Sequence, residues 1–124
     1  MVAAGIQTVV ANTWRSPITI AVQQAENCPP ELTRSAYGMQ QCARSHPQAI
    51  FAIGNAPTAL IALCEGIARG DWQPALVIGA PVGFINVVES KQKLAGLAVP
   101  HILVAGRKGG SAVAAAILNA VMIA

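Results

Sequence analysis

Short apolar runs and longer segments with helical spacing alternate along the second half of the chain, and each apolar run is followed by a glycine-containing loop. The predicted strands are 48–53, 74–78 and 99–104, and the helices predicted after them are 59–69, about 84–94 and 112–124. A run that is apolar at every position is typical of a strand covered on both faces. The alternation therefore predicts an α/β domain with a mostly parallel sheet.

The first part of the chain is less regular. A strand is predicted at 6–11, a short helix at 18–22 and a longer helix at 31–42, just after the break at Pro29 and Pro30. Residues 1–4 are typical of the end of a helix that stops at Gly5. A helix end without a start indicates that the chain begins part-way through a domain, although a short natural N-terminus gives the same pattern.

The basic loop from Gly106 to Ser111 is the most distinctive of the three glycine loops. Gly109 and Gly110 allow positive φ angles, Ser111 is a candidate N-cap, and Arg107 and Lys108 place two cations beside the start of a helix. Such a corner attracts anions. The alternative is that the glycines only form a tight turn and that both cations are solvated.

In a parallel sheet the three loops leave the strands at the same edge, where open α/β sheets bind ligands. Neither the nucleoside-triphosphate loop, Gly-x-x-x-x-Gly-Lys-Ser/Thr, nor the dinucleotide motif, Gly-x-Gly-x-x-Gly, occurs. A carboxylate at a helix N-terminus gains roughly 0.3 to 1 kcal/mol, so several such corners favour a ligand with several carboxylates.

The amino-acid composition limits the kinds of function that the chain can have. The 124 residues are enough for one domain, 1–124, and the contrast of 54% hydrophobic with 10% charged residues indicates that some surface meets a partner subunit. The net charge of +3 and five scattered aromatic rings argue against nucleic-acid binding. They favour a small acidic ligand.

The three cysteines, Cys28, Cys42 and Cys64, are odd in number and lack the spacing of metal ligands, which predicts reduced thiols in a cytoplasmic protein without a metal site. The longest apolar run, 112–124, is interrupted by Asn119 and is too short to span a bilayer. We therefore expect a soluble chain without a membrane partner.

Few residues can move protons. His46 lies in a Ser-His-Pro turn and His101 at the start of a predicted strand, so both are interpreted as structural. Glu65 is interpreted as a solvent-facing helix residue. Glu89, Ser90 and Lys91 form either a polar functional cluster or, as we favour, an ordinary exposed helix face.

Three segments occur in a specific order: Ile53-Gly54-Asn55-Ala56-Pro57-Thr58-Ala59-Leu60, then Gly79-Ala80-Pro81-Val82-Gly83-Phe84 with Glu89-Ser90-Lys91, then Gly106-Arg107-Lys108-Gly109-Gly110-Ser111-Ala112 with Asn119. In this order they resemble the precorrin-8X methylmutase family, also called precorrin isomerase, of cobalamin biosynthesis. Thr33-Arg34-Ser35 and the opening segment 1–6 also resemble segments of that family, so the likeness covers nearly the whole chain.

The resemblance implies a three-layer flavodoxin-like fold, here with about four strands and without the family's first strand and helices. It implies a cytoplasmic homodimer or higher oligomer that moves a methyl group from C11 to C12 of precorrin-8X, or of cobalt-precorrin-8, to give hydrogenobyrinic or cobyrinic acid. No cofactor is implied. By the same resemblance the substrate-binding residues are Thr33, Arg34, Asn55, Thr58, Gly83, Arg107, Gly109, Gly110 and Ser111.

The chain departs from the family in one respect. Family members are longer by some 80 residues at the N-terminus, by the same resemblance, and the histidine that serves as general acid lies in that part; neither His46 nor His101 matches it. The catalytic residue is therefore unknown. A truncation, a degradation product and a half-length relative remain alternatives, as do a non-catalytic tetrapyrrole- or polycarboxylate-binding module and an interaction remnant that dimerises through 112–124.

Overall fold

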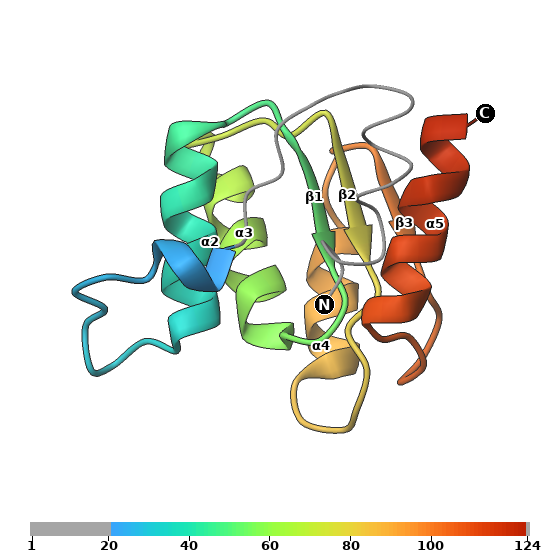
Figure 1. Cartoon of the computed structure of the whole chain (residues 1–124), viewed down its shortest axis with the longest axis horizontal. Helices are drawn as coiled ribbons and strands as arrows, with labels where there is room; N and C mark the ends of the chain where they lie inside the picture. Colours follow the sequence, from blue (N-terminus) through green and yellow to red (C-terminus); the bar gives the residue numbers. More distant parts are fainter. Residues whose placement is uncertain (1–20, 124) are drawn as a thin grey trace.

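Three parallel strands form the centre of the computed structural model, which describes residues 21–123 (Figure 1). Along the chain the elements are η1 (Ala21–Gln24), α2 (Arg34–Ser45), β1 (Ile50–Ile53), α3 (Pro57–Arg69), β2 (Leu76–Gly79), α4 (Val87–Ala95), β3 (His101–Leu103) and α5 (Ser111–Ile123). The strand order is β1-β2-β3, with Ile50 paired to Leu76 and Val77 to His101. The predicted α/β fold with a parallel sheet is confirmed.

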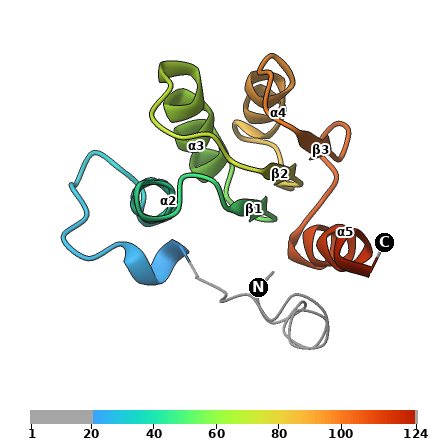
Figure 2. The ribbon, with the colours of Figure 1, turned by 90° about the horizontal axis from the view of Figure 1, so that it is seen from above.

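Helices lie on both faces of this sheet, which gives three layers (Figure 2). The helices α3 and α4 cover one face, and α5 covers the other. The helix α2 packs against α3, and the 3-10 helix η1 packs against α2.

Strand side chains contribute to a core on each face. Phe51 and Ile53 of β1 join the buried cluster beneath α2, α3 and α4, whereas Ile50 and Ala52 pack with the cluster beneath α5. Successive strand residues point to opposite faces, so a strand buried on both sides needs an apolar residue at every position. This arrangement explains the continuous apolar runs in the sequence.

The helix α2 begins at Arg34 and ends at Ser45, so the predicted range 31–42 was shifted by three residues. Thr33 has extended φ and ψ angles of −73° and 154°, and its side-chain oxygen accepts a hydrogen bond from the amide of Ala36 at 3.0 Å. A hydroxyl in this position ends the extended segment and starts the helix. The Pro pair marked the break but not the first helical residue.

The helix α4 begins at Val87, three residues after its predicted start near 84. Asn86 is left-handed, with φ of 61° and ψ of 7°, and this conformation cannot continue a right-handed helix. Phe84 and Ile85 consequently lie in a loop, where each is 82% exposed. The prediction for α3 is confirmed, with Pro57 in its first turn and a left-handed Gly70 at its end.

The helix α5 starts at Ser111 itself, so the prediction that Ser111 is the N-cap was wrong. The carbonyl of Gly110 accepts the first helical hydrogen bond, from the amide of Ala114 at 3.0 Å, and Gly110 therefore holds the cap position. The predicted strand 6–11 and the helix end at 1–4 lie outside the described residues. The predicted helix 18–22 lies partly outside them and overlaps η1.

The three cysteines are free thiols, with Cys42 and Cys64 buried and Cys28 half-buried. Within the range 21–123, none of the helices is long and apolar enough to cross a bilayer.

Candidate functional site

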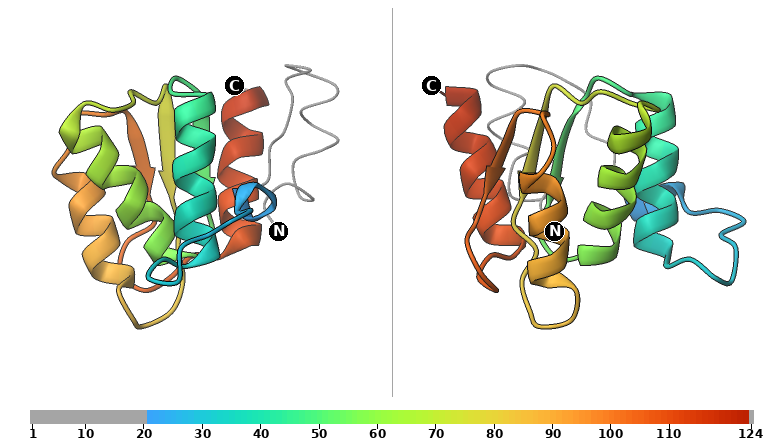
Figure 3. Two further views of the ribbon diagram at one scale, coloured as in Figure 1. Left: turned by 90° about the vertical axis from the view of Figure 1, so that its left-hand side faces the viewer. Right: turned by 180° about the vertical axis from the view of Figure 1, so that it is seen from behind.

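The three glycine loops leave the carboxyl ends of their strands at one edge of the sheet (Figure 3). They are the β1–α3 loop (54–56), the β2–α4 loop (80–86) and the β3–α5 loop (104–110). We call these loops, together with Thr33 and the first residues of α2, α3 and α5, the carboxyl rim. The sequence prediction that the loops share one edge is confirmed.

The β1–α3 loop touches the start of α5. A Cβ built on Gly54 would lie 2.6 Å from the Cα of Ser111 and 2.9 Å from its amide nitrogen. Both are backbone atoms that cannot rotate away, so only glycine permits this approach. The first loop and the last helix are therefore in direct backbone contact.

The β2–α4 and β3–α5 loops are joined by backbone hydrogen bonds. The amide of Gly110 donates to the carbonyl of Ala80 at 2.8 Å, and the amide of Gly83 donates to the carbonyl of Arg107 at 3.2 Å. Gly109 has a φ of 150°, and a Cβ there would overlap the carbonyl oxygen of Ala80. The glycines thus bring two loops together as well as forming turns.

The start of α2 joins the rim through side chains. The hydroxyl oxygens of Thr33 and Thr58 lie 3.0 Å apart, which is hydrogen-bond distance. Thr58 belongs to the first turn of α3, and Arg34 is the first residue of α2, directly after Thr33. The exposed Arg34 therefore starts its helix beside the start of α3.

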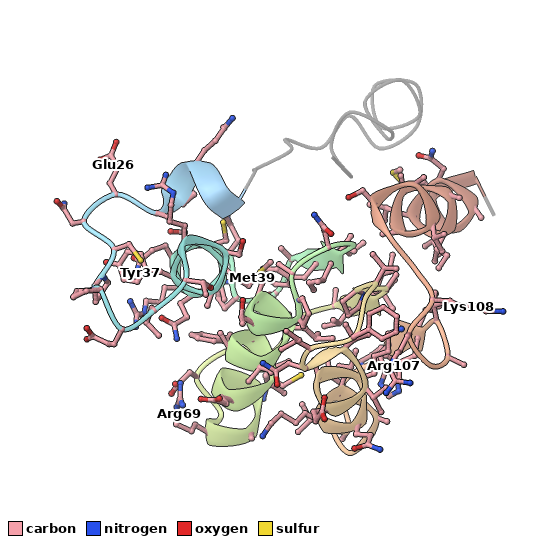
Figure 4. All side chains as sticks on the ribbon, turned by 90° about the horizontal axis from the view of Figure 1, so that it is seen from below. Glu26, Tyr37, Met39, Arg69, Arg107 and Lys108 are labelled. Carbon is pink, nitrogen blue, oxygen red and sulfur yellow. The ribbon has the colours of Figure 1, made fainter. Side chains whose placement is uncertain are left out.

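Cations and helix N-termini make this edge electropositive. Arg107 and Lys108 are exposed in the β3–α5 loop, and in Figure 4 the side chain of Lys108 projects away from the body of the molecule. The guanidinium of Arg107 lies over the ring of Phe84, 5.7 Å from its centroid, at a distance typical of a cation–π contact. The N-termini of α3 and α5 add the positive ends of their helix dipoles.

The family model described as precorrin-8X methylmutase (CbiC) matches residues 1–124. The chain belongs to the precorrin-8X methylmutase family.

Several relatives of the family are similar to this chain. A cobalt-precorrin-8 methylmutase from Synechocystis is 51% identical over 123 residues, covering 99% of this chain and 57% of the relative. A precorrin-8X methylmutase from Pseudomonas aeruginosa is 47% identical over 90 residues, covering 71% of this chain and 43% of the relative. The chain thus matches about half the length of these relatives, 57% of the first and 43% of the second.

A solved structure of the family has the same fold. The precorrin-8X methylmutase from Thermus thermophilus matches with a TM-score of 0.83 and 35% identity, over 98% of this chain and 61% of that one. The likeness to a precorrin-8X methylmutase fold that the sequence indicated is therefore confirmed.

All nine residues that the resemblance assigned to substrate binding lie on the carboxyl rim: Thr33, Arg34, Asn55, Thr58, Gly83, Arg107, Gly109, Gly110 and Ser111. Their gathering is a finding, whereas their contacts with a substrate remain predictions. Asn55 is exposed in the β1–α3 loop, and Thr58 and Ser111 are half-buried.

Sequence reasoning missed the burial of Lys91. Val87, Ser90, Lys91 and Leu94 follow the spacing of one helix face, and all four are buried. The interpretation of Glu89, Ser90 and Lys91 as an exposed face therefore holds only for Glu89. Helical spacing counted from Val87 would have found the buried face, but Ser90 and Lys91 were judged by residue type rather than by position.

Phe84 was also missed as a partner of Arg107. It was assigned to a helix, and the left-handed Asn86 that leaves it in a loop gives no strong signal in the sequence.

Neither histidine of the chain lies on the carboxyl rim. His46 is at the C-terminal end of α2, and His101 opens β3, where its Nδ1 lies 2.8 Å from the carbonyl oxygen of Val99. Within the part of the chain that the structure describes, no three His, Cys, Asp or Glu side chains are grouped so as to hold a metal ion.

Proposed function

We propose that this chain forms a substrate-binding side of precorrin-8X methylmutase in cobalamin biosynthesis. The reaction moves a methyl group from C11 to C12 of precorrin-8X, or of cobalt-precorrin-8, and gives hydrogenobyrinic or cobyrinic acid. Membership of the family supports the reaction. The observation that carries the binding role is the backbone contact of all three glycine loops at the carboxyl rim.

The chemistry of the carboxyl rim suits this substrate, which carries acetate and propionate arms. The amides at the starts of α3 and α5 attract carboxylates, and Arg34 and Arg107 would add charge-assisted hydrogen bonds. Each such bond contributes roughly 1.5 to 3 kcal/mol. If each of the three glycine loops held one carboxylate arm, the orientation of the ring would be fixed.

Phe84 adds an apolar surface beside one of these cations. Phe84 is 82% exposed, and its ring lies beneath the Arg107 guanidinium. A flat apolar macrocycle with charged arms fits an aromatic ring next to an arginine, because ring and carboxylate can then be contacted at the same time.

The methyl shift takes place within one molecule: the bond between the methyl group and C11 breaks, and the same methyl group forms a bond to C12. The protein's part is to hold the ring and to supply a proton to a ring nitrogen. By the family resemblance the donor is a histidine that neither His46 nor His101 matches, and both lie away from the carboxyl rim. This placement favours a second function for the chain by itself, binding of a tetrapyrrole polycarboxylate without turnover.

We also propose a homodimer that works in the cytoplasm. Val113 of α5 is 38% exposed, and Ile85 is 82% exposed in the β2–α4 loop. These apolar surfaces support a partner subunit. Light scattering that gave a monomer at micromolar concentration would contradict the dimer.

Titration with hydrogenobyrinic acid and a turnover assay with precorrin-8X test the function. Saturable binding together with conversion of the substrate's absorption spectrum to that of the product would support the methylmutase. Binding without spectral conversion would support the second function. Absence of any spectral or thermal-stability response to hydrogenobyrinic acid would contradict both.

A further inference from the structure

Lys91 is a buried cation, and no Asp or Glu side chain of the described residues forms an ion pair with it. The residue is 6% exposed, and its ammonium donates to the carbonyl of Gly106 at 2.7 Å and to that of Lys108 at 2.8 Å. The five acidic side chains of the chain lie within residues 21–123, and the ion pair there joins Asp71 to Arg69 rather than to Lys91. The ammonium is therefore held by loop carbonyls and not by a carboxylate.

Burial makes this arrangement costly. Removal from water lowers the pKa of the Lys91 ammonium from its usual value. Two short hydrogen bonds from a cation compensate for the lost hydration. Both of these compensating bonds go to the β3–α5 loop, so the burial of Lys91 is linked to the conformation of that loop.

The two bonds fix the direction of the peptide groups in that loop. The carbonyls of Gly106 and Lys108 point to the Lys91 ammonium, and the carbonyl of Arg107 between them accepts from the amide of Gly83. In a planar trans peptide the N–H points opposite to the C=O. The amides of Arg107 and Gly109 therefore point away from Lys91.

The negative ends of two peptide dipoles thus face the ammonium, and their positive ends face the opposite side of the loop. Two amides turned to the same side of a loop present partial positive charge there, which attracts anions. The exposed side chains of Arg107 and Lys108 belong to the same loop. Without such bonds, a loop with this many glycines would sample many backbone conformations, and its peptide dipoles would have no fixed direction.

We propose that Lys91 is a positioning residue, whose ammonium holds the β3–α5 loop in the shape that receives a carboxylate arm of the substrate. The inference rests on the proposed function, and it assigns the loop's anion-binding shape to a side chain that does not itself touch the ligand. Lys91→Met tests it, because methionine keeps the length and the apolar stem but removes the charge and the donors. Lys93→Met, at an exposed position two residues further along α4, is the matched control.

Limited trypsin digestion of the full chain reads the loop without any ligand. Trypsin cleaves after Arg107 and Lys108, and mass spectrometry follows cleavage there relative to cleavage after the exposed Arg44. We expect Lys91→Met to raise the relative rate at the loop at least tenfold and Lys93→Met to leave it unchanged. An unchanged ratio in Lys91→Met would overturn the proposal.

Titration of hydrogenobyrinic acid then links the loop to binding. We expect affinity to fall at least tenfold in Lys91→Met and by less than twofold in Lys93→Met. Full affinity in Lys91→Met despite faster cleavage of its loop would contradict the positioning role alone. A wild-type chain that does not bind would contradict both the proposed function and this inference. If Lys91→Met does not fold, Lys91→Gln, which keeps a neutral donor, is measured with the same expected directions and the same contradicting results.

Discussion

The hydroxyl oxygen of Thr33 lies 3.0 Å from that of Thr58 and also accepts from the amide of Ala36, so one side chain caps α2 and joins it to α3. The first residue of α2, Arg34, thereby begins beside the carboxyl rim. A single hydroxyl thus serves both the stability of the helix and the placement of a cation.

Replacement of Thr33 by valine removes the hydroxyl and keeps nearly the same side-chain shape, so it measures what the hydroxyl contributes. Thr33→Val removes the cap and the contact with Thr58, and we expect a loss of about 1 kcal/mol in the free energy of unfolding, measured in urea. Thr33→Ser should remain close to wild type because it keeps the hydroxyl. Thr58→Val should cost less than Thr33→Val, since the cap survives; an equal or larger cost would show that the cap contributes little.

Substitution of Gly54 tests the contact between the β1–α3 loop and α5. In Gly54→Ala the new Cβ would meet backbone atoms of Ser111 at 2.6 and 2.9 Å, so the loop and the helix must separate. We expect destabilisation of roughly 1 to 3 kcal/mol, as for other overpacked sites, and weaker binding of hydrogenobyrinic acid.

Gly96→Ala is the matched control for this prediction. Gly96 has a right-handed φ of −81°, and a Cβ there would lie 3.7 Å from its nearest neighbours. We expect unchanged or slightly higher stability, because alanine restricts the unfolded chain. Equal losses in both variants would refute the importance of the close approach.

Removal of the Arg34 guanidinium should weaken ligand binding with little effect on the fold. The side chain is exposed, so Arg34→Ala should leave the melting temperature nearly unchanged. A lost charge-assisted hydrogen bond of roughly 1.5 to 3 kcal/mol corresponds to a ten- to hundredfold lower affinity for hydrogenobyrinic acid in a titration. Arg44→Ala, at the other end of the same helix, should bind like wild type; identical affinities for both variants would count against the proposed site.

The cysteines should differ in reactivity. Burial raises the pKa of Cys64 above its ordinary value of 9.0 to about 11, with a smaller raising contribution from Glu65 and a lowering one from Lys93. Burial also raises the pKa of Cys42. We expect one fast and two slow thiols with a disulfide reagent at pH 8, because the thiolate is the reactive form and Cys28 is the least buried.

The same burial links stability to pH. The folded state holds the Cys64 thiol protonated, so its contribution to stability is full below about pH 9 and is lost as the pH rises toward about 11. The urea midpoint of wild type should therefore fall more steeply over this range than that of Cys64→Ala. Parallel profiles would show that the thiol ionises equally in both states.

The sequence predicted those parts of the fold that local signals specify. Continuous apolar runs located the three described strands, and Pro57 and Gly70 located both ends of α3. The starts of α2 and α4 were misplaced because each depends on one backbone conformation, at Thr33 and at Asn86. Such single-residue choices are decided by packing and capping rather than by composition.

The candidate site, like the fold, could be predicted only in part. The parallel order of the strands was enough to place the three loops together, and the family resemblance supplied the residue names. The bonds from Lys91 to Gly106 and Lys108 were not predictable, because they join residues 15 and 17 positions apart through a side chain whose type is usually exposed. Helical spacing can place Lys91 on the buried face of α4, but only the three-dimensional arrangement shows which carbonyls its ammonium meets.

The amide of Gly110 bound to the carbonyl of Ala80, with Gly54 against Ser111, has a consequence for protein engineering. Grafting one of these loops from a relative with a different substrate preference would disturb the backbone of each segment that it contacts. Redesign of ligand selectivity in this scaffold therefore requires the three segments to be transplanted as a set.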